Sequence, residues 1–133
     1  MIKGFTLVEL VIVIIIVGIL SIVAVPIYKG YVKRSITVEG KTLLGIIQAT
    51  EKAYFAENTK YLDVPTTSFN ETLDIDVRSN RYFTSFTVYS NEEHGDEARY
   101  TAITTTNSGI ANGVSLTIMG KYKGEHIYTD SGL

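Results

Sequence analysis

Hydrophobic residues are distributed very unevenly along this chain. The first block, residues 5–27, is apolar except for one carboxylate, Glu9, and a few small or hydroxyl side chains. The eighteen residues from Leu10 to Ile27 carry no charge. As a helix they would extend about 27 Å, close to the roughly 30 Å of a membrane's hydrocarbon core. The pattern therefore predicts a membrane helix with one ionisable side chain near its start.

Two other interpretations of this block are weaker. A cleaved secretory signal would explain the basic residue Lys3, but the apolar core of such a signal is normally about 7–15 residues long. A helix buried inside the protein's own fold is disfavoured by the density of β-branched residues in a chain of only 133 residues.

Apolar residues continue at helical spacing beyond Pro26, which predicts an amphipathic helix that packs one face on a sheet. The apolar stripe contains Leu43, Ile47 and Tyr54, with Ile46, Ala49 and Ala53 beside it. The polar face contains Lys41, Gln48, Glu51, Lys52 and Glu57, continuing a solvated face of Lys33, Arg34 and Glu39. Together with the first block, one helix is expected from Thr6 to about Glu57. A bend is expected at Pro26, because proline has no N–H to donate, and Gly18 weakens the same stretch.

The second half of the chain shows the patterns of strands and turns. Residues 58–80 have no sustained period and are expected to form a loop, with a short helical turn near residues 69–74. Aromatic, β-branched or alternating segments then predict strands at residues 81–89, 99–106, 114–119 and 126–129. The segments between them, residues 91–98, 107–113 and 120–125, are turn-like. We expect an α+β fold in which a long N-terminal helix packs on a roughly four-stranded antiparallel sheet.

Composition and charge argue against several classes of function. Twelve basic and fourteen acidic residues give a net charge of −2, with no basic block, which argues against nucleic-acid binding. The chain has no cysteine, which excludes disulfides and thiolate chemistry. No nucleophile–base pair or phosphate-binding loop stands out, so we predict no enzyme, no cofactor and no metal site.

A few polar groups are candidate ligands or modification sites. His94 and His126 have no second ligand at metal spacing, and Asp130 stands nearly alone. The acidic loop at residues 92–97 offers oxygen ligands for Ca²⁺, but its spacing matches no EF-hand and a solvated hairpin is preferred. The sequon at residues 70–72 is only a weak three-residue match for N-glycosylation.

The start of the apolar block contains a more specific motif. Thr6-Leu7-Val8-Glu9 fits a capping box, in which the threonine and glutamate side chains bind backbone N–H groups at a helix start. Capping does not explain the Gly4–Phe5 junction before it. The segment KGFTLVEL, with the long apolar run and Pro26, resembles the N-terminus of type IV pilins and pseudopilins.

This resemblance covers residues 1 to about 60 and implies processing of the chain. A prepilin peptidase would cleave between Gly4 and Phe5, releasing residues 1–4 as a leader, and Phe5 would be N-methylated. The four-residue leader is at the short end for the family. Glu9 falls at the fifth mature position, where the family has its glutamate. The α+β head also resembles the pilin architecture.

The resemblance gives Glu9 a partner. The new amine on Phe5 would be cationic near neutral pH, and in a filament Glu9 of one subunit would pair with Phe5 of its neighbour. A subunit docked out of register would leave a charge buried alone. Gly18 to Pro26 would be the stretch that unwinds in the filament.

The implied protein is a major pilin that polymerises into an extracellular type IV pilus-like filament. Residues 5–28 would be the transmembrane and assembly helix, and residues 29–133 the head. Its partners would be identical subunits, the prepilin peptidase and methyltransferase, and an inner-membrane assembly platform. The alternatives are a major pseudopilin of a type II secretion system and a membrane-anchored binding module that never assembles.

The charges that flank the helix predict a membrane orientation opposite to that of the pilin family. Lys3 precedes the apolar run, whereas Lys29, Lys33 and Arg34 follow it, so the positive-inside rule places the head in the cytoplasm. We follow the family orientation, with the head outside, because a cleavable leader must face its peptidase.

Overall fold

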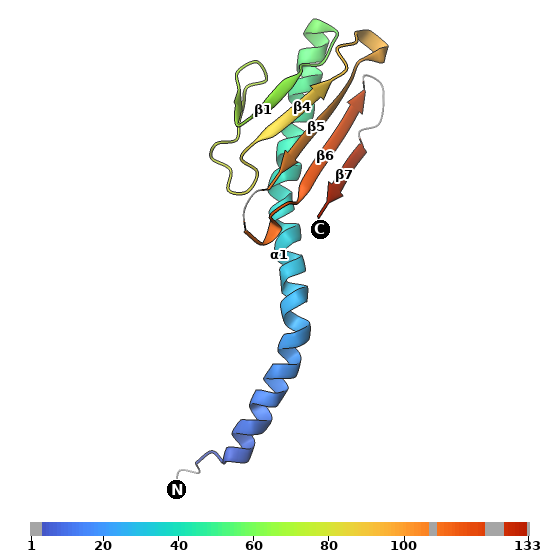
Figure 1. The fold of residues 1–133 in the computed structure, drawn as a ribbon. Coiled ribbons are helices and arrows are strands. Elements are labelled where there is room, and N and C mark those ends of the chain that lie inside the picture. Colours follow the sequence, from blue (N-terminus) through green and yellow to red (C-terminus); the bar gives the residue numbers. More distant parts are fainter. Residues whose placement is uncertain (1–3, 107–108, 122–126, 133) are drawn as a thin grey trace.

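The computed structural model describes residues 4–106, 109–121 and 127–132, in which one α-helix and seven strands occur. The helix is α1 (Leu7–Asn58), and it lies behind the sheet in Figure 1. The strands are β1 (Val64–Thr67), β2 (Phe69–Asn70), β3 (Ile75–Asp76), β4 (Phe86–Ser90), β5 (Arg99–Thr105), β6 (Ser115–Lys121) and β7 (Ile127–Ser131). Two 3-10 turns, η1 (Gly95–Glu97) and η2 (Gly109–Ala111), lie between strands. The α+β fold is confirmed.

The single long helix is confirmed with nearly the expected ends. It begins after Thr6, whose side chain and that of Glu9 form the predicted capping box. It ends at Thr59, which adopts a left-handed φ of 58° and donates its N–H to the Phe55 carbonyl at 2.8 Å. Pro26 is accommodated inside a continuous helix.

The main sheet has five strands in the order β1-β4-β5-β6-β7, all antiparallel, where roughly four were expected. The additional strand, β1, comes from the segment expected to be a loop. It contains Pro65, which cannot donate to a ladder and is compatible only with an edge, and its register shifts between Val64 and Thr67. Because of the proline and the shifted register, the sequence of β1 shows no alternation of apolar and polar residues that would predict a strand.

Two further expectations are corrected by the structure. The helical turn expected near residues 69–74 is a turn within a small antiparallel pair, β2–β3. The strand expected at residues 81–89 begins only at Phe86, because the segment before it lies against α1. There Glu39, expected to be solvated, accepts hydrogen bonds from the backbone N–H groups of Tyr82 and Phe83, both at 2.9 Å.

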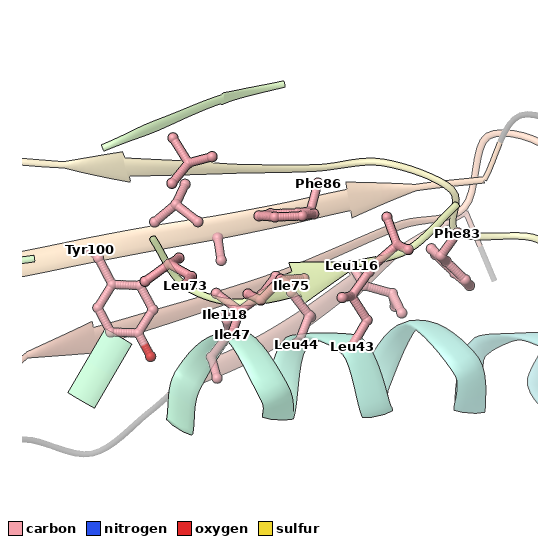
Figure 2. Close-up of a cluster of buried hydrophobic side chains, with 14 of the residues drawn as sticks. Leu43, Leu44, Ile47, Leu73, Ile75, Phe83, Phe86, Tyr100, Leu116 and Ile118 are labelled. Atoms are coloured by element: carbon pink, nitrogen blue, oxygen red, sulfur yellow. The ribbon is translucent and has the colours of Figure 1, made fainter. Parts of the chain in front are cut away.

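The core lies between the second half of α1 and the inner face of the sheet. Figure 2 shows Leu43, Leu44 and Ile47 of the helix directed at side chains from the strands. The predicted alternation in β6 is confirmed, since Leu116 and Ile118 are buried. No residue from 4 to 31 belongs to this cluster.

The buried stripe of the helix differs from the predicted one. Ile46 is 47% exposed, and Ala49 and Ala53 are also exposed. The buried helical residues are Ile36, Thr37, Gly40, Leu43, Leu44, Ile47, Glu51 and Phe55. Their spacing of three and four is regular, so the sequence contained the correct stripe. The predicted stripe differs because the buried one includes a carboxylate, a side chain that the sequence pattern places on the solvated face.

That carboxylate, Glu51, is fully buried where the last turns of α1 meet the following loop. Its Oε2 accepts a hydrogen bond from the Leu62 N–H at 3.0 Å, while its Oε1 has no hydrogen-bond partner among the described residues. Burial raises the pKa of Glu51 to about 7; the Leu62 bond opposes this shift and the nearby Asp63 adds to it. The loop is also held by Tyr61, whose ring lies 4.9 Å from that of Phe55.

Gly40 marks the closest approach of the helix to the sheet. A Cβ atom built at this position would lie 2.5 Å from Leu116 Cδ1 and 2.7 Å from Phe83 Cζ. By contrast, a Cβ atom at Gly45, on the same helix, would meet nothing within 4 Å. Of these two glycines, Gly40 is the one that packing requires.

We predict that Gly40→Ala destabilises the protein by about 1–3 kcal/mol, because overpacking outweighs the gain in helix propensity. The matched variant Gly45→Ala should be neutral or stabilising by up to about 1 kcal/mol. Thermal unfolding of the full chain in detergent, followed by the tyrosine near-ultraviolet circular dichroism, measures both. Equal effects of the two substitutions would contradict the close contact at Gly40.

A second prediction concerns the buried carboxyl of Glu51. Its pKa is raised in the folded state from the ordinary 4.5, so the folded protein holds this proton more tightly than the unfolded chain. This contribution to the free energy of unfolding should be full below about pH 4.5, decline by about 3 kcal/mol as the pH rises, and level off above about pH 7. Glu51→Gln should remove this decline, whereas Glu57→Gln, at an exposed position on the same helix, should keep it. Denaturant titrations between pH 4 and pH 8 test this, and an unchanged decline in Glu51→Gln would contradict it.

Candidate functional site

The N-terminal half of α1 is an apolar surface with no partner in its own chain. Every residue from 4 to 31 is exposed, and Figure 1 shows this part of the helix extending away from the sheet. Within the described residues α1 is the one helix long and apolar enough to cross a membrane, with a mean hydropathy of 3.3 over its most apolar 18-residue window. None of that window is buried. Such a surface in water is unfavourable and needs lipid or protein to cover it.

Local hydrogen bonds satisfy the few polar groups of this surface. The Ser21 hydroxyl donates to the Val17 carbonyl at 2.7 Å, one turn back, so it needs no partner from the surroundings. The capping box satisfies backbone groups at the helix start. The segment can therefore remain helical in a medium that offers no hydrogen bonds.

Glu9 is the one charged side chain between Gly4 and Tyr28, and hydrogen bonds with Thr6 define its geometry. Oε2 of Glu9 accepts the Thr6 N–H at 2.9 Å and the Thr6 hydroxyl at 2.7 Å. The Glu9 N–H in turn donates to the Thr6 hydroxyl oxygen at 3.3 Å. The other carboxylate oxygen, Oε1, has no hydrogen-bond partner among the described residues, and the side chain is exposed. One oxygen is thus used for capping and the other is open to a group from another molecule.

The remaining predicted site residues lie along the same helix. Gly4 and Phe5 precede the helix, and Phe5 is 82% exposed. The bond between them thus lies outside the helix. Gly18 and Pro26 lie within the continuous helix, and a Cβ atom at Gly18 would meet nothing within 4 Å. Unwinding between them stays a prediction about the filament.

The other groups weighed from the sequence have ordinary structural roles or fall outside the structure. Nδ1 of His94 lies 3.3 Å from the Thr59 hydroxyl, and Asp130 pairs with Lys41 at 3.5 Å. The sequon residue Asn70 accepts the Leu73 N–H through its side chain at 2.9 Å, closing a turn. His126 lies outside the described residues. In the described part of the chain, no group of three or more His, Cys, Asp or Glu residues is placed to hold a metal ion.

Comparison with known proteins identifies the N-terminal segment. Residues 1–25 match the family model of the prokaryotic N-terminal methylation motif. The chain is 39% identical over 80 residues, or 60% of its length, to the type IV major pilin protein PilA of Myxococcus xanthus (strain DK1622). It is 46% identical over 55 residues (41% of the chain) to the fimbrial protein EcpC of Eikenella corrodens. It is 54% identical over 41 residues (31% of the chain) to the type IV major fimbrial protein FimA of Dichelobacter nodosus.

The family model matches the part of the chain that carries the apolar surface. The matched segments span only 34%, 36% and 26% of the lengths of these three relatives. The resemblance to type IV pilins indicated by the first residues is confirmed by both comparisons. This chain carries the prokaryotic N-terminal methylation motif, and it is similar in sequence to type IV major pilins.

Proposed function

We propose that this chain is the major subunit of a type IV pilus-like filament. The observation that carries the proposal is an apolar half-helix, wholly uncovered in its own chain, that begins with the methylation motif. Identical half-helices packed together would cover one another's apolar surface and leave the heads outside. The relatives named above are major pilins and fimbrial proteins, which favours a pilus over a secretion pseudopilus.

Burial of the half-helix supplies the driving force for assembly. Covering a large aliphatic side chain is worth about 1.5–3 kcal/mol when it comes from water. Before assembly, however, the helix would reside in the membrane, where lipid already covers it. The gain on moving from lipid into a filament must then come from packing and from polar contacts rather than from the hydrophobic effect.

A charge pair is the polar contact that this surface offers. Cleavage after Gly4 would convert the Phe5 N–H into a cationic amine, and the open Oε1 of Glu9 on a neighbouring subunit would receive it. The attraction between opposite charges grows as the dielectric constant falls, and a single uncompensated charge in the same surroundings is strongly disfavoured. The pair would therefore favour the one axial register in which every Glu9 meets an amine.

The proposed life cycle has two locations. The precursor would sit in the inner, or cytoplasmic, membrane, where a prepilin peptidase and methyltransferase act on Gly4 and Phe5. An assembly platform in that membrane would then add the subunit to an extracellular filament on the bacterial surface. Residues 5–28 would move from lipid into the filament core, and the head would move out with them.

Processing can be tested directly by mass spectrometry of the N-terminus. We expect the mature chain to begin with N-methylated Phe5. A chain with an intact Met1, or one that begins after Ala24, would reject processing as a prepilin. The first result would favour a membrane-anchored module and the second a secreted protein.

The charge pair is tested by Glu9→Gln. Glutamine can still accept in a capping box, so the helix start should be preserved while the charge is removed. We expect cleavage at Gly4 to continue and the amount of sheared filament seen by electron microscopy to fall at least about tenfold. The converse variant, Thr6→Val, removes the cap hydroxyl but keeps the charge, and it should still assemble. Normal filaments from Glu9→Gln would refute the pairing.

A further inference from the structure

A cluster of cations lies where the apolar half-helix meets the head. Lys29 and Arg34 are exposed on α1, and Lys33 between them is half-buried and donates to the Gly132 carbonyl at 3.1 Å. Among the described residues, none of these three cations has an ion-pair partner. Residues 10–38 contain no acidic side chain, so the positive charge is not balanced along this part of the helix. We call the three cations the basic collar.

The end of the sheet beside the basic collar adds positive charge and an exposed aliphatic side chain. The turn η2 contacts α1, and Figure 1 shows it at the end of the sheet nearest the N-terminus. Ile110 of this turn is 46% exposed, and residues 100–120 contain no charged side chain. Arg81 is exposed and lies 5.3 Å from the ring of Tyr82, which lines a hollow with Val32 of α1. This end of the head is therefore suited to an anionic surface.

The acidic side chains of the head are either engaged or distant from the basic collar. Glu39, the next acid along the helix, accepts two backbone N–H groups at 2.9 Å, and Asp130 is paired with Lys41 at 3.5 Å. The largest group of acids lies in the β4–β5 loop at residues 92–97, which Figure 1 shows at the opposite end of the sheet. Charge is thus separated along α1, with positive charge next to the apolar half-helix.

The position of the basic collar along α1 matches the headgroup layer of a membrane. The uncharged run from Leu10 to Ile27 has about the length of a hydrocarbon core. Residues 28–34 rise a further 10 Å or so, and the headgroup layer on each side is about 5–7 Å thick. Tyr28 and Tyr31, each 66% exposed, lie at the same level, and tyrosine is enriched at membrane interfaces. The cations and tyrosines therefore lie at the level expected of lipid phosphates.

A shallow hollow at this level offers room for part of a lipid headgroup. Its lining consists of Pro26, Ile27, Gly30, Tyr31 and Arg34. A Cβ atom at Gly30 would meet nothing within 4 Å, so no other part of the chain covers the helix there. The lining combines apolar side chains with one guanidinium and one phenol hydroxyl, a combination that suits the boundary between acyl chains and phosphates.

We propose that the basic collar binds the phosphates of anionic phospholipids and holds the adjacent end of the head, with Ile110 and Arg81, against the membrane surface. This inference rests on the membrane stage of the proposed function, before assembly. Lysine and arginine form charge-assisted hydrogen bonds with phosphate oxygens, and each cation near an anionic membrane adds to the attraction. The contact gives the cations after the helix a role on the head side of the membrane, where the positive-inside rule does not expect them.

The competing occupant is the acidic loop of a second copy. Before assembly, every copy in the membrane would hold that loop at the far end of its head. α1 continues beyond Arg34 to Asn58, about 36 Å of helix, so the loop of one copy lies far above the collar of its neighbour. Lipid is the anionic partner available at the level of the collar, and the experiment below distinguishes the two occupants.

A single fluorescent probe tests the contact in the full chain. The chain has no cysteine, so Asn112→Cys introduces a unique thiol for a fluorophore at an exposed position beside η2. The labelled chain is placed in lipid nanodiscs that carry a quencher on a small fraction of headgroups. We expect quenching to be at least about twofold greater with about one third phosphatidylglycerol than with phosphatidylcholine alone. The difference should disappear near about 1 M salt, because salt screens exposed charges.

Charge reversal identifies the residues responsible. Lys29→Glu combined with Arg34→Glu should reduce quenching in anionic discs to the level in phosphatidylcholine, with the near-ultraviolet circular dichroism of the head unchanged. Lys52→Glu combined with Lys60→Glu, at exposed lysines near the far end of α1, should leave quenching as it is.

Three results would overturn the inference: equal quenching in the two lipids, full quenching in the collar variant, or quenching that rises with the number of copies per disc in either lipid. The last would indicate a second copy as the occupant. A chain that does not enter the discs at all would instead show that the membrane stage of the proposed function is wrong.

Discussion

The constraint on which this structure depends is that one helix has two different surroundings. The second half of α1 is held by a sheet from its own chain, whereas residues 4–31 are exposed throughout. No rearrangement of a head this small could cover the first half as well, because the helix extends far beyond the sheet (Figure 1). The protein is therefore incomplete as a single chain, and its function must include whatever covers that apolar surface.

Both halves of the helix contain one glutamate where a charge is unfavourable. Glu9 lies in the uncovered half and Glu51 in the buried half, and each carboxylate uses one oxygen to accept a backbone N–H, from Thr6 and Leu62 respectively. The two glutamates differ in the surroundings of their second carboxylate oxygen. The second oxygen of Glu9 faces the outside, where another molecule can supply a cation, whereas that of Glu51 is enclosed. Enclosure raises the pKa of Glu51 to about 7, whereas the exposed carboxylate of Glu9 is the one for which we propose a role between molecules.

The two faces of the main sheet have different surroundings: the inner face packs on α1, and the outer face is turned away from it. Alternation along β4, β5 and β6 directs Val88, Ala102 and Ile118 to the helix, whereas Tyr89, Thr101 and Met119 lie on the opposite face. The inner face tolerates little change, since the helix comes so close at Gly40 that no side chain fits. The outer face is free of that demand. Its apolar and charged side chains can serve contacts with other molecules without altering the fold.

The sequence by itself determined the elements with strong local signals: the capped apolar helix, the prepilin-like start with Gly4, Phe5 and Glu9, and the strands with clear alternation. It did not determine β1, because a short edge strand with a proline is fixed by the ladder of β4 and not by its own period. The sequence pattern also places Glu51 on the polar face of the helix, whereas it is buried. Only its packing against the loop after α1 shows that a carboxylate can occupy an apolar stripe. The register that aligns Tyr89, Thr101, Met119 and Ile127 was likewise decided by tertiary structure, since pairing between strands joins residues that no local pattern connects.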